Sequence, residues 1–402
     1  MKILVLNCGS SSIKSQVFET SPEQIAASED RVLAKAVVDR IGTRDAIVSV
    51  TAGGRRTRST RPVADRDEAL KAIIEAVSEY GPIEAVGHRV VHGGESFQEP
   101  VEFTEEVVEK IEDLYDLAPL HNPHNVRGFR TARALLPDAR HVAVFDTAFH
   151  QTLPQEAYLY GIPYSYYAQE QYRRYGFHGV SHRYISWRYA QIHGKPKDEF
   201  KVISCHLGNG SSMCAIRHGH SIDTSMGFTP LEGLVMGTRC GDIDPSLVLH
   251  MMAMTGDGPS EMENLLTRKS GLFGLSGLSA DMRLLLDFRR KGDSRAAMAI
   301  DVFCYRVKKY IGSYLASLNG ADAIVFTGGI GENAAPVREQ ICAGMDGLGI
   351  RIDKIANDAA IGKEAQISFP DSPVNVWVIP TNEELLIARD TLRCLLGLPQ
   401  PD

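Results

Sequence analysis

Two arginines in this sequence stand next to glycines, where small neighbours let a ligand approach closely. Arg89 lies in the segment 88–94 at the end of an apolar stretch, and Arg239 lies in the segment 237–242, which is too rich in glycine for a helix. A guanidinium group carries planar N–H donors that bind phosphate or carboxylate oxygens in pairs. A solvated surface side chain is the alternative for each arginine taken alone. The glycine context favours a phosphate-binding role.

Two turns of small polar residues repeat half a chain length apart. One covers residues 7–12 and the other 208–212, and each joins two apolar segments. Backbone N–H groups and hydroxyls in such turns form a concave site that suits phosphate oxygens. One copy would read as an ordinary hairpin, whereas two copies indicate a phosphate clamp split between two related domains.

A third glycine cluster, residues 327–333, follows an apolar segment and precedes a helical pattern. It departs from the dinucleotide-binding fingerprint because Ala334 stands where the third glycine is expected. Bare glycine backbone at the start of a helix still suits a nucleotide. The sequence contains no Walker A motif, so its phosphate cradle must be built in another way.

Three further side chains are candidates for chemistry by their position. The ring of His178 is reachable between Gly176 and Gly179, although a lone histidine is more often structural. Asp146 follows a predicted strand, and α/β proteins bind ligands at the carboxyl ends of strands. Glu383 opens the last predicted helix, where a carboxylate either complements the helix dipole or helps to hold Mg²⁺.

An α/β framework must position these residues, because short apolar segments alternate with helical patterns along the chain. The clearest helix covers Arg295–Leu318, where apolar residues recur every three or four positions. The polar segment 51–67 is expected to be a solvated loop or hairpin. The predicted strands are 3–6, 13–18, 47–50, 85–91, 141–145, 201–206, 212–217, 323–326 and 375–379.

Composition narrows the class of protein. A length of 402 residues with 44% hydrophobic content predicts two or three domains with sizeable cores. A net charge of −7, spread along the chain without a block of like sign, argues against a nucleic-acid partner. Seven cysteines without a Cys-x-x-Cys pair argue against a disulfide framework and favour a cytoplasmic location. No apolar stretch reaches the roughly 20 residues of a membrane span, and the N-terminal apolar run is too short for a signal peptide.

In the order of its motifs the sequence resembles the acetate kinase family, of the sugar-kinase, heat-shock-chaperone and actin superfold. The resemblance implies duplicated actin-like (ribonuclease H-like) α/β domains with a nucleotide cleft between them. The N-terminal domain is expected to comprise residues 1–147 and 383–402, and the C-terminal nucleotide-binding domain residues 148–382. A homodimer is also implied. The segments that carry the resemblance are 7–14, 88–94, 118–123, 145–150, 206–212, 226–233 and 380–384.

The resemblance further implies the reversible, direct in-line transfer of the γ-phosphoryl group of ATP to acetate, with Mg²⁺ or Mn²⁺ as cofactor. Propionate or butyrate is an alternative acceptor, because one methylene changes binding by only about 1–3 kcal/mol. A more remote alternative is a non-catalytic actin-like ATP-binding switch. The two arginines and an apolar pocket distinguish the enzyme from that switch, which has no use for them.

The roles implied for individual residues fall into four groups. The catalytic residues are Arg89, Asp146, His178 and Arg239. The carboxylate substrate is expected to contact Arg89, Val91, Leu120, Phe177 and Pro230. The metal is assigned to Asn7 and Glu383. The nucleotide is assigned to Asn7, Ser10, Ser12, Lys14, His206, Leu207, Gly208, Asn209, Gly210, Asp281, Met282, Arg283, Gly329, Ile330, Gly331 and Asn333. The family usually has an aromatic where Met282 stands, so stacking on the adenine is not expected from that side.

The chemistry of the residues agrees with this reaction. Two anions, a triphosphate and a carboxylate, must approach each other, and arginines with directed N–H groups offset their repulsion. A carboxylate with a pKa of about 4 to 5 is already ionised at neutral pH, so no general base is needed. Asp146 is therefore expected to orient other groups rather than to accept a proton.

Overall fold

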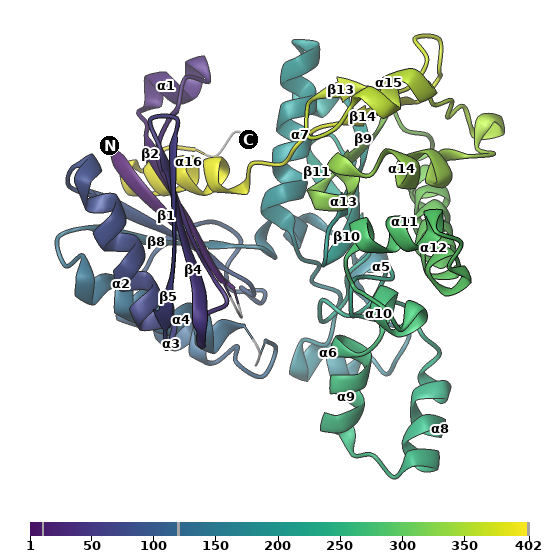
Figure 1. Ribbon diagram of the computed structural model, residues 1–402, viewed down its shortest axis with the longest axis horizontal. Coiled ribbons are helices and arrows are strands. Elements are labelled where there is room, and N and C mark those ends of the chain that lie inside the picture. Colours follow the sequence, from purple (N-terminus) through teal and green to yellow (C-terminus); the bar gives the residue numbers. More distant parts are fainter. Residues whose placement is uncertain (10–11, 119–120, 400–402) are drawn as a thin grey trace. The chain divides into compact units, whose positions relative to one another are not determined.

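The computed structural model describes residues 1–9, 12–118 and 121–399, and the chain forms two compact units (Figure 1). Unit 1 comprises Met1–Ala148 and Asn382–Asp402, and unit 2 comprises Phe149–Thr381. The boundaries expected from the sequence lie one residue from these, and the assignment of the nucleotide to unit 2 stays a prediction. Each unit is built on one sheet.

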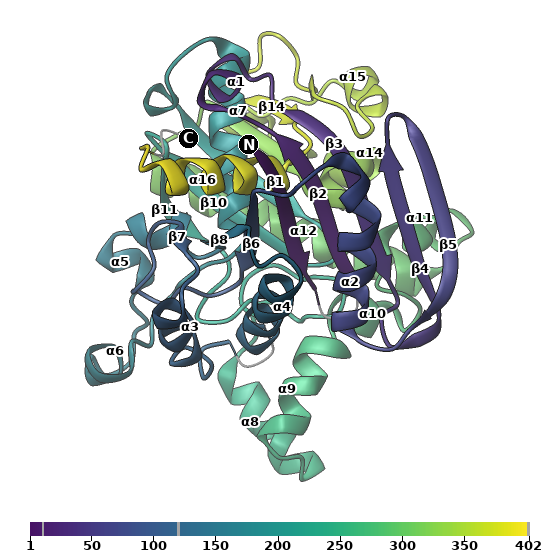
Figure 2. The same ribbon diagram turned by 90° about the vertical axis from the view of Figure 1, so that its left-hand side faces the viewer.

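Unit 1 contains an eight-stranded sheet in the order β5-β4-β3-β2-β1-β6-β8-β7. β1 pairs antiparallel with β2 and parallel with β6, and β6 pairs parallel with β8. Figure 2 shows β4 and β5 at one edge of this sheet. The strands are β1 (Lys2–Cys8), β2 (Ser12–Glu19), β3 (Arg31–Asp39), β4 (Thr43–Ala52), β5 (Arg55–Val63), β6 (Ala85–Val90), β7 (Val101–Glu102) and β8 (Arg140–Phe145).

Helices cover both faces of the unit 1 sheet. Leu4 and Leu6 of β1 belong to the core that α2 and α4 close. On the other face α16 packs against Gly87, where a methyl group would lie 2.4 Å from Oγ1 of Thr391. A glycine therefore lets α16 approach β6 closely. The helices are α1 (Pro22–Ala27), α2 (Arg66–Val77), α3 (Glu105–Glu112), α4 (Asn122–Leu135) and α16 (Glu383–Leu396).

Unit 2 contains a six-stranded sheet in the order β11-β10-β9-β12-β14-β13. Its antiparallel pairs β11-β10-β9 followed by the parallel strands β12 and β14 repeat the arrangement of β3-β2-β1-β6-β8. This repeated topology confirms the duplicated α/β fold predicted from the two turns. The strands are β9 (Lys201–Leu207), β10 (Ser211–Arg217), β11 (His220–Thr224), β12 (Ala323–Thr327), β13 (Ala365–Gln366) and β14 (Asn375–Val378).

Alternation along β9 separates the two faces of the unit 2 sheet. Cys205 and Leu207 belong to the core against α12, whereas Ser204 and His206 hydrogen-bond to side chains of α7. The predicted helix 295–318 is confirmed as α12, whose N-terminus is capped by Asp293. The helices are α5 (Gln155–Tyr158), α6 (Ser165–Glu170), α7 (Gly179–His193), α8 (Pro245–Thr255), α9 (Pro259–Arg268), α10 (Gly271–Ser276), α11 (Met282–Arg290), α12 (Ser294–Leu318), α13 (Gly328–Asn333), α14 (Ala335–Cys342) and α15 (Lys354–Ala359).

Each of the nine predicted strands overlaps an observed strand. The polar segment 51–67 contains the turn and the second arm of a hairpin, in which Gly53 and Gly54 join β4 to β5, and it ends at the start of α2. Every residue of β5 except Val63 is exposed, so this strand carries no apolar alternation. Among the described residues, no helix combines the length and apolar character needed to cross a membrane.

Candidate active site

In unit 1, Arg89 is held by acidic and amide side chains from neighbouring strand ends. Its Nε donates to Oδ1 of Asp146 at 2.9 Å, and its Nη2 also binds the Asp146 carboxylate. Its Nη1 donates to Oδ1 of Asn7 at 3.1 Å. Glu383, the first residue of α16, places Oε2 at 3.8 Å from Nε. The structure thus brings four predicted site residues together in unit 1.

The charges in this cluster shift two ionisation equilibria. Burial, reinforced by the charge of Asp146 and opposed by Arg89, raises the pKa of Glu383 to about 7. Burial works against ionisation of Arg89, but the charges of Asp146 and Glu383 outweigh it and raise the pKa of that guanidinium. The cluster therefore holds more negative charge than one arginine neutralises, and a cation would relieve it.

The same cluster fits a magnesium ion. The amide oxygen of Asn7 and the carboxylate of Glu383 are hard oxygen ligands, which Mg²⁺ prefers. Within the described ranges, no group of three or more His, Cys, Asp and Glu side chains is arranged to hold a metal ion. A cation here would therefore take one or two protein oxygens and complete its shell with phosphate oxygens and water, as Mg²⁺ commonly does.

Two asparagines of α4 hold the backbone that follows Arg89. The N–H of Val91 donates to Oδ1 of Asn125 at 3.1 Å. Asn122 exchanges two hydrogen bonds with the backbone of His92, at 3.2 and 3.0 Å. Sequence reasoning missed both asparagines as positioning groups, although Asn122 lies in one of the motifs. The predicted substrate contact Leu120 and the predicted nucleotide contact Ser10 lie outside the described residues.

The turn between β1 and β2 is closed by a hydrogen bond from the N–H of Gly9 to the carbonyl of Ser12, at 2.9 Å. Lys14 pairs in register with Asn7 across the two strands, and its side chain is exposed. Lys14 is therefore accessible for the phosphate contact predicted for it.

In unit 2, His178 is fixed by stacking and by a hydrogen bond. Its ring stacks on that of His206 with centroids 4.4 Å apart. Its Nδ1 lies 3.0 Å from Oγ of Ser212, which in turn lies 2.7 Å from Nε2 of His182. A methyl group built on Gly210 would lie 3.5 Å from Nε2 of His178. The Nε2 edge of His178 therefore faces the second glycine turn.

Arg239 approaches the same glycine. The methyl group built on Gly210 would lie 3.5 Å from Nη1 of Arg239. That nitrogen donates to the carbonyl of Pro230 at 3.2 Å and contacts Sδ of Met236 at 3.7 Å. Among the described residues, no carboxylate lies within 4.0 Å of the Arg239 guanidinium. Burial lowers the pKa of Arg239. A partly buried cation without a counter-ion is a binding site for an anion.

The second and third glycine clusters meet in unit 2. A methyl group built on Gly208 would lie 4.0 Å from the backbone nitrogen of Gly329. Gly328, at the start of α13, approaches β9 so closely that a methyl group there would lie 2.8 Å from the carbonyl of Leu207. Asn209 and Gly329 are exposed. Backbone groups of both clusters are therefore available to one nucleotide.

Other predicted nucleotide and substrate residues make structural contacts or are buried. Asp281 caps α11 and forms an ion pair with Arg283 at 2.6 Å. Met282 packs in the unit 2 core. Asn333 is exposed and donates to the carbonyl of Gly329 at 3.0 Å. The remaining side chains are buried or partly buried: Phe177, His206, Leu207, Pro230 and Ile330.

Comparison with known proteins gives full-length matches. The model of the acetokinase family matches residues 2–389. The acetate kinase of Thermoanaerobacterium thermosaccharolyticum is 51% identical over 407 residues, which cover 99% of this chain and 100% of that protein. The acetate kinase of Thermotoga maritima is 50% identical, with 97% of this chain and 98% of that protein covered.

Two solved structures are similar over nearly the whole chain. Porphyromonas gingivalis acetate kinase has a TM-score of 0.89 and 43% identity, and the match covers 98% of this chain and 99% of the other. A propionate kinase from Francisella tularensis has a TM-score of 0.90 and 40% identity, with 99% and 100% covered.

Proposed function

Because this chain belongs to the acetokinase family, we propose that it catalyses the reversible transfer of the ATP γ-phosphoryl group to acetate, giving acetyl phosphate and ADP. It is an enzyme, a phosphotransferase with a carboxyl group as acceptor. Among the residues of the site, Arg239 supports the proposal most directly. Its guanidinium lies beside His178 and Gly210 without a carboxylate partner among the described residues.

The proposed chemistry is positioning and charge stabilisation rather than proton transfer. Acetate is ionised at neutral pH and attacks the γ-phosphorus directly. Arg239 donates to the oxygens of the transferring group, and Nε2 of His178 adds a hydrogen bond there. Arg89 binds the acetate carboxylate. Asp146 orients Arg89, because both of its carboxylate oxygens bind that guanidinium.

Magnesium belongs to the same proposal. Asn7 and Glu383 would hold Mg²⁺ or Mn²⁺, and the bound ion would neutralise negative charge on the phosphate oxygens. With a pKa of about 7, Glu383 is about half protonated at pH 7, and binding of a cation would favour its ionised form.

Nucleotide recognition is assigned mainly to backbone and small side chains. Gly208, Asn209 and Gly210 are proposed to bind phosphate oxygens, and a phosphate contact is likewise proposed for the first turn of unit 1. The adenosine lies against the start of α13, where Gly329 is exposed. The residues proposed to contact the nucleotide are Asn7, Ser10, Ser12, Lys14, His206, Leu207, Gly208, Asn209, Gly210, Asp281, Met282, Arg283, Gly329, Ile330, Gly331 and Asn333.

The acyl chain of the substrate is assigned to apolar residues, namely Val91, Leu120, Phe177 and Pro230. An apolar pocket wall changes the binding free energy of two carboxylates that differ by one methylene by only about 1–3 kcal/mol. The structural similarity to a propionate kinase from Francisella tularensis therefore favours propionate as the second candidate substrate.

An acyl phosphate trapping assay tests the reaction. Purified protein is incubated with ATP, Mg²⁺, hydroxylamine and acetate, propionate or butyrate in parallel. The proposal expects acetohydroxamate at the highest kcat/KM, with propionate second. A higher kcat/KM for propionate would reassign the substrate, and no hydroxamate from any acid would refute the kinase activity.

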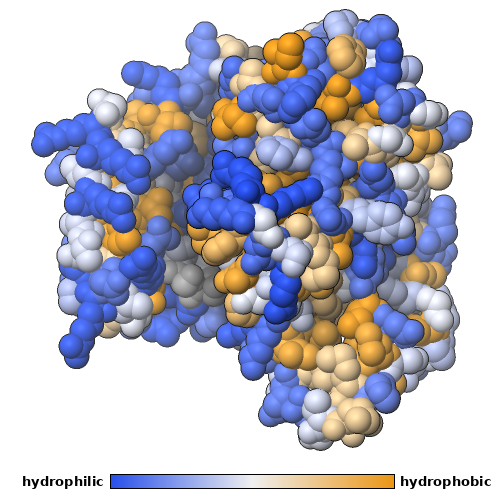
Figure 3. Space-filling view, turned by 45° about the vertical axis from the view of Figure 1, so that its right-hand side comes forward, coloured by the Kyte–Doolittle hydropathy of each residue, from blue (hydrophilic) through white to orange (hydrophobic). Residues whose placement is uncertain are grey.

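We further propose a homodimer that forms through α8. This helix of 11 residues, Pro245–Thr255, is mostly apolar and has no buried residue. Leu249 is 67% exposed and Met254 is 73% exposed. Figure 3 shows apolar side chains gathered on the lower projection, where α8 and α9 lie in Figure 1. Exposed apolar surface of this kind marks a protein interface, and a second copy is the partner that the family suggests.

The reaction is assigned to the cytoplasm. All seven cysteines are without a disulfide bond. Reduced cysteines are typical of a cytosolic enzyme.

A further inference from the structure

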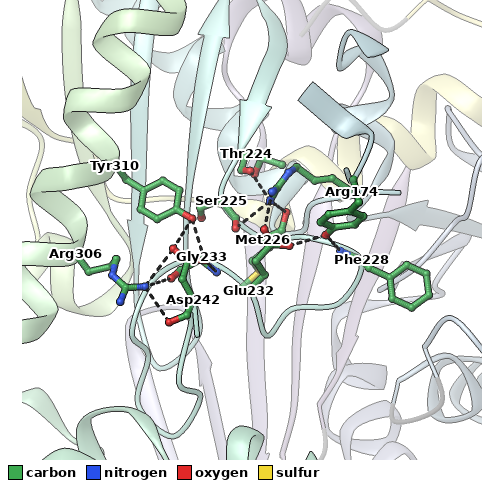
Figure 4. A network of polar contacts seen from close by, with 11 residues as sticks. Arg174, Thr224, Ser225, Met226, Phe228, Glu232, Gly233, Asp242, Arg306 and Tyr310 are labelled. Atoms are coloured by element: carbon green, nitrogen blue, oxygen red, sulfur yellow. Dashed lines mark hydrogen bonds and ion pairs between the residues drawn. The ribbon is translucent and has the colours of Figure 1, made fainter. Parts of the chain in front are cut away.

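A network of polar side chains surrounds the turn that carries Pro230 in unit 2 (Figure 4). The turn covers residues 227–233 and follows the end of β11. It connects to Arg239, since the carbonyl of Pro230 accepts a hydrogen bond from Nη1 of that arginine at 3.2 Å. Contacts that restrain this turn therefore also restrain the orientation of the Arg239 guanidinium.

One tyrosine hydroxyl binds both ends of the turn. The N–H of Phe228 donates to Oη of Tyr160 at 2.8 Å. The same hydroxyl donates to Oε2 of Glu232 at 2.5 Å. Since Phe228 and Glu232 flank Pro230, the hydroxyl closes the loop around that residue and restrains its backbone.

An arginine connects the turn to the sheet. Nη2 of Arg174 donates to Oε1 of Glu232 at 2.6 Å. Its Nη1 donates to three successive backbone carbonyls at the end of β11, those of Thr224, Ser225 and Met226, at 3.2, 3.3 and 3.1 Å. The Arg174 side chain is 17% exposed and that of Glu232 is 32% exposed, so this charge-assisted ion pair is partly shielded from water.

The packing around Glu232 requires a glycine at position 227. A methyl group built on Gly227 would lie 1.7 Å from Oε2 of Glu232 and 2.2 Å from Oη of Tyr160. The carboxylate and the hydroxyl therefore occupy the space that any larger residue would need. The hydrogen bond between these two groups can form because Gly227 has no side chain.

A second anchor holds the segment that ends in Asp242. The N–H of Gly233 donates to Oδ1 of Asp242 at 2.8 Å, and the N–H of Asp242 donates to the carbonyl of Gly233 at 2.9 Å. Tyr310 donates to the same carboxylate, and Arg306 forms an ion pair with it at 3.1 Å. Both side chains come from α12, as Figure 4 shows on its left side. These contacts join the two ends of the segment 233–242, which contains Arg239.

We infer that Tyr160, Arg174 and Glu232 are positioning residues: they hold Pro230 in the geometry needed for the carboxylate substrate and, through its carbonyl, Arg239 in the geometry needed for the transferring group. The inference rests on the proposed function, because it takes Pro230 as a wall of the acyl site and Arg239 as a ligand of the transferring group. It assigns a role to side chains that touch neither reactant. Loss of the network lets the turn move, and the acyl site then fits acetate less well.

The test compares two tyrosine variants in the full-length enzyme. Tyr160→Phe removes the hydroxyl that binds Phe228 and Glu232. Tyr158→Phe is the matched control, because the Tyr158 hydroxyl lies 3.2 Å from that of Tyr167 and does not contact the turn. We expect Tyr160→Phe to raise the KM for acetate at least fivefold and to lower the acetate-to-propionate ratio of kcat/KM at least threefold. The KM for ATP stays within twofold, and Tyr158→Phe leaves all three quantities unchanged.

Two further variants make the outcome independent of the stability of Tyr160→Phe. Glu232→Gln keeps the size of the side chain but removes the ion pair with Arg174, and Gly227→Ala displaces both partners of the turn. Both are expected to change the acetate KM and selectivity in the same direction. Gly227→Ala should also lower the midpoint of thermal unfolding, because its methyl group overpacks the network. If the wild type is active but neither Glu232→Gln nor Tyr160→Phe changes the acetate KM or the selectivity, this inference is overturned and the proposed function stands. A wild type without acyl phosphate formation overturns the proposed function, and this inference with it.

Discussion

The two arginines of the candidate site differ in what surrounds each guanidinium group. Arg89 binds both carboxylate oxygens of Asp146 and the amide oxygen of Asn7, so its plane is fixed before any ligand arrives. Arg239 contacts a carbonyl and a sulfur atom, and no carboxylate of the described chain neutralises it within 4.0 Å. An arginine without a carboxylate partner binds a phosphoryl group without first breaking an ion pair. Arg89 is therefore suited to orient the substrate and Arg239 to stabilise charge that develops during transfer.

Replacing Arg239 tests the residue on which the proposal depends. Arg239→Ala is expected to lower kcat by a factor of 10³ to 10⁵, or about 4–7 kcal/mol of barrier, because the cation acts on the transferring group. The KM for ATP should change less than threefold. Steady-state kinetics with hydroxylamine trapping measures both quantities.

A surface arginine provides the control for this variant. Arg290 lies on α11 with its side chain 76% exposed, so Arg290→Ala should keep wild-type kinetics. An Arg239→Ala enzyme with wild-type kcat would remove this arginine from the mechanism.

Glu383 makes stability depend on pH in a direction that follows from its raised pKa. The folded-state pKa of about 7 lies above the ordinary value of 4.5, so the folded protein binds the proton more tightly than the unfolded chain does. Its contribution to stability is fully present below pH 4.5 and is lost as the pH rises to about 7. The glutamine of the Glu383→Gln variant cannot ionise, so the variant does not lose this stability as the pH rises. Without Mg²⁺, the free energy of unfolding of the variant relative to that of the wild type should therefore rise by up to about 3 kcal/mol between pH 4.5 and pH 8.

Urea unfolding at pH 5 and pH 8 measures this difference. Added Mg²⁺ should raise the stability of the wild type at pH 8 and leave that of Glu383→Gln unchanged, because binding to the folded state is stabilising. The same gap between the two proteins at both pH values would contradict the assigned ionisation.

At the scale of elements, strand order explains how residues far apart in the sequence meet. β1, β6 and β8 are parallel neighbours in unit 1, so their carboxyl ends present Asn7, Arg89 and Asp146 at one edge. α16 adds Glu383 because its first turn reaches this edge. In unit 2 the turn after β9 and the helix after β12 meet in the same way, since β9 and β12 are parallel neighbours. Ligand sites at the carboxyl ends of parallel strands are a general property of α/β sheets.

The contact between β6 and α16 can be tested with a pair of glycine substitutions. Gly87→Ala would place a methyl group 2.4 Å from Oγ1 of Thr391 and 2.8 Å from Cγ2 of Ile387, which forces α16 away from the sheet. Such overpacking should lower the free energy of unfolding by about 1–3 kcal/mol. Activity should fall as well, because Arg89 and Glu383 lie on these two elements.

Gly312→Ala is the matched substitution without a clash. Gly312 lies inside α12, and a methyl group there would meet no atom within 4 Å. Alanine favours the helix, so stability should rise by about 0.5–1 kcal/mol. Chemical denaturation of both variants gives the comparison, and equal stabilities would argue against a close contact of α16 with β6.

At the scale of the whole molecule, the proposed dimer depends on α8. A helix that is apolar around its circumference and exposed in a single chain is normally buried in a larger assembly. Leu249→Asp should convert the dimer to a monomer, because an unpaired carboxylate would be buried at the interface. Since Leu249 is 67% exposed in the single chain, the variant should fold as the wild type does.

Light scattering coupled to size exclusion measures the mass of each variant. Leu348→Asp is the control, because Leu348 is 54% exposed and lies outside α8. It should remain dimeric. A wild-type enzyme with the mass of one chain, or a dimeric Leu249→Asp variant, would exclude this interface.

Much of the fold could be predicted because buried strands and helices leave a local apolar pattern. The nine predicted strands overlap observed ones, and the stripe of α12 marks the helix that covers the unit 2 sheet. Prediction failed where the pattern is weak. β5 is an exposed edge strand, and the inward residues of β3 include the small Ala34 and Ala36. β11 has Ile222 as its one apolar residue between polar neighbours, so it contains no apolar run to recognise.

The sequence by itself determined the residue types of the candidate site and the repeated glycine turns, because side-chain chemistry and backbone freedom are local properties. The tertiary structure alone decided which groups pair. Arg89 meets Asp146, 57 positions away, and Tyr160 meets Glu232, 72 positions away. Arg239 meets no carboxylate among the described residues. Pairing of this kind depends on which strands become neighbours and on how closely helices pack, and these are set by contacts between distant segments rather than by any local pattern.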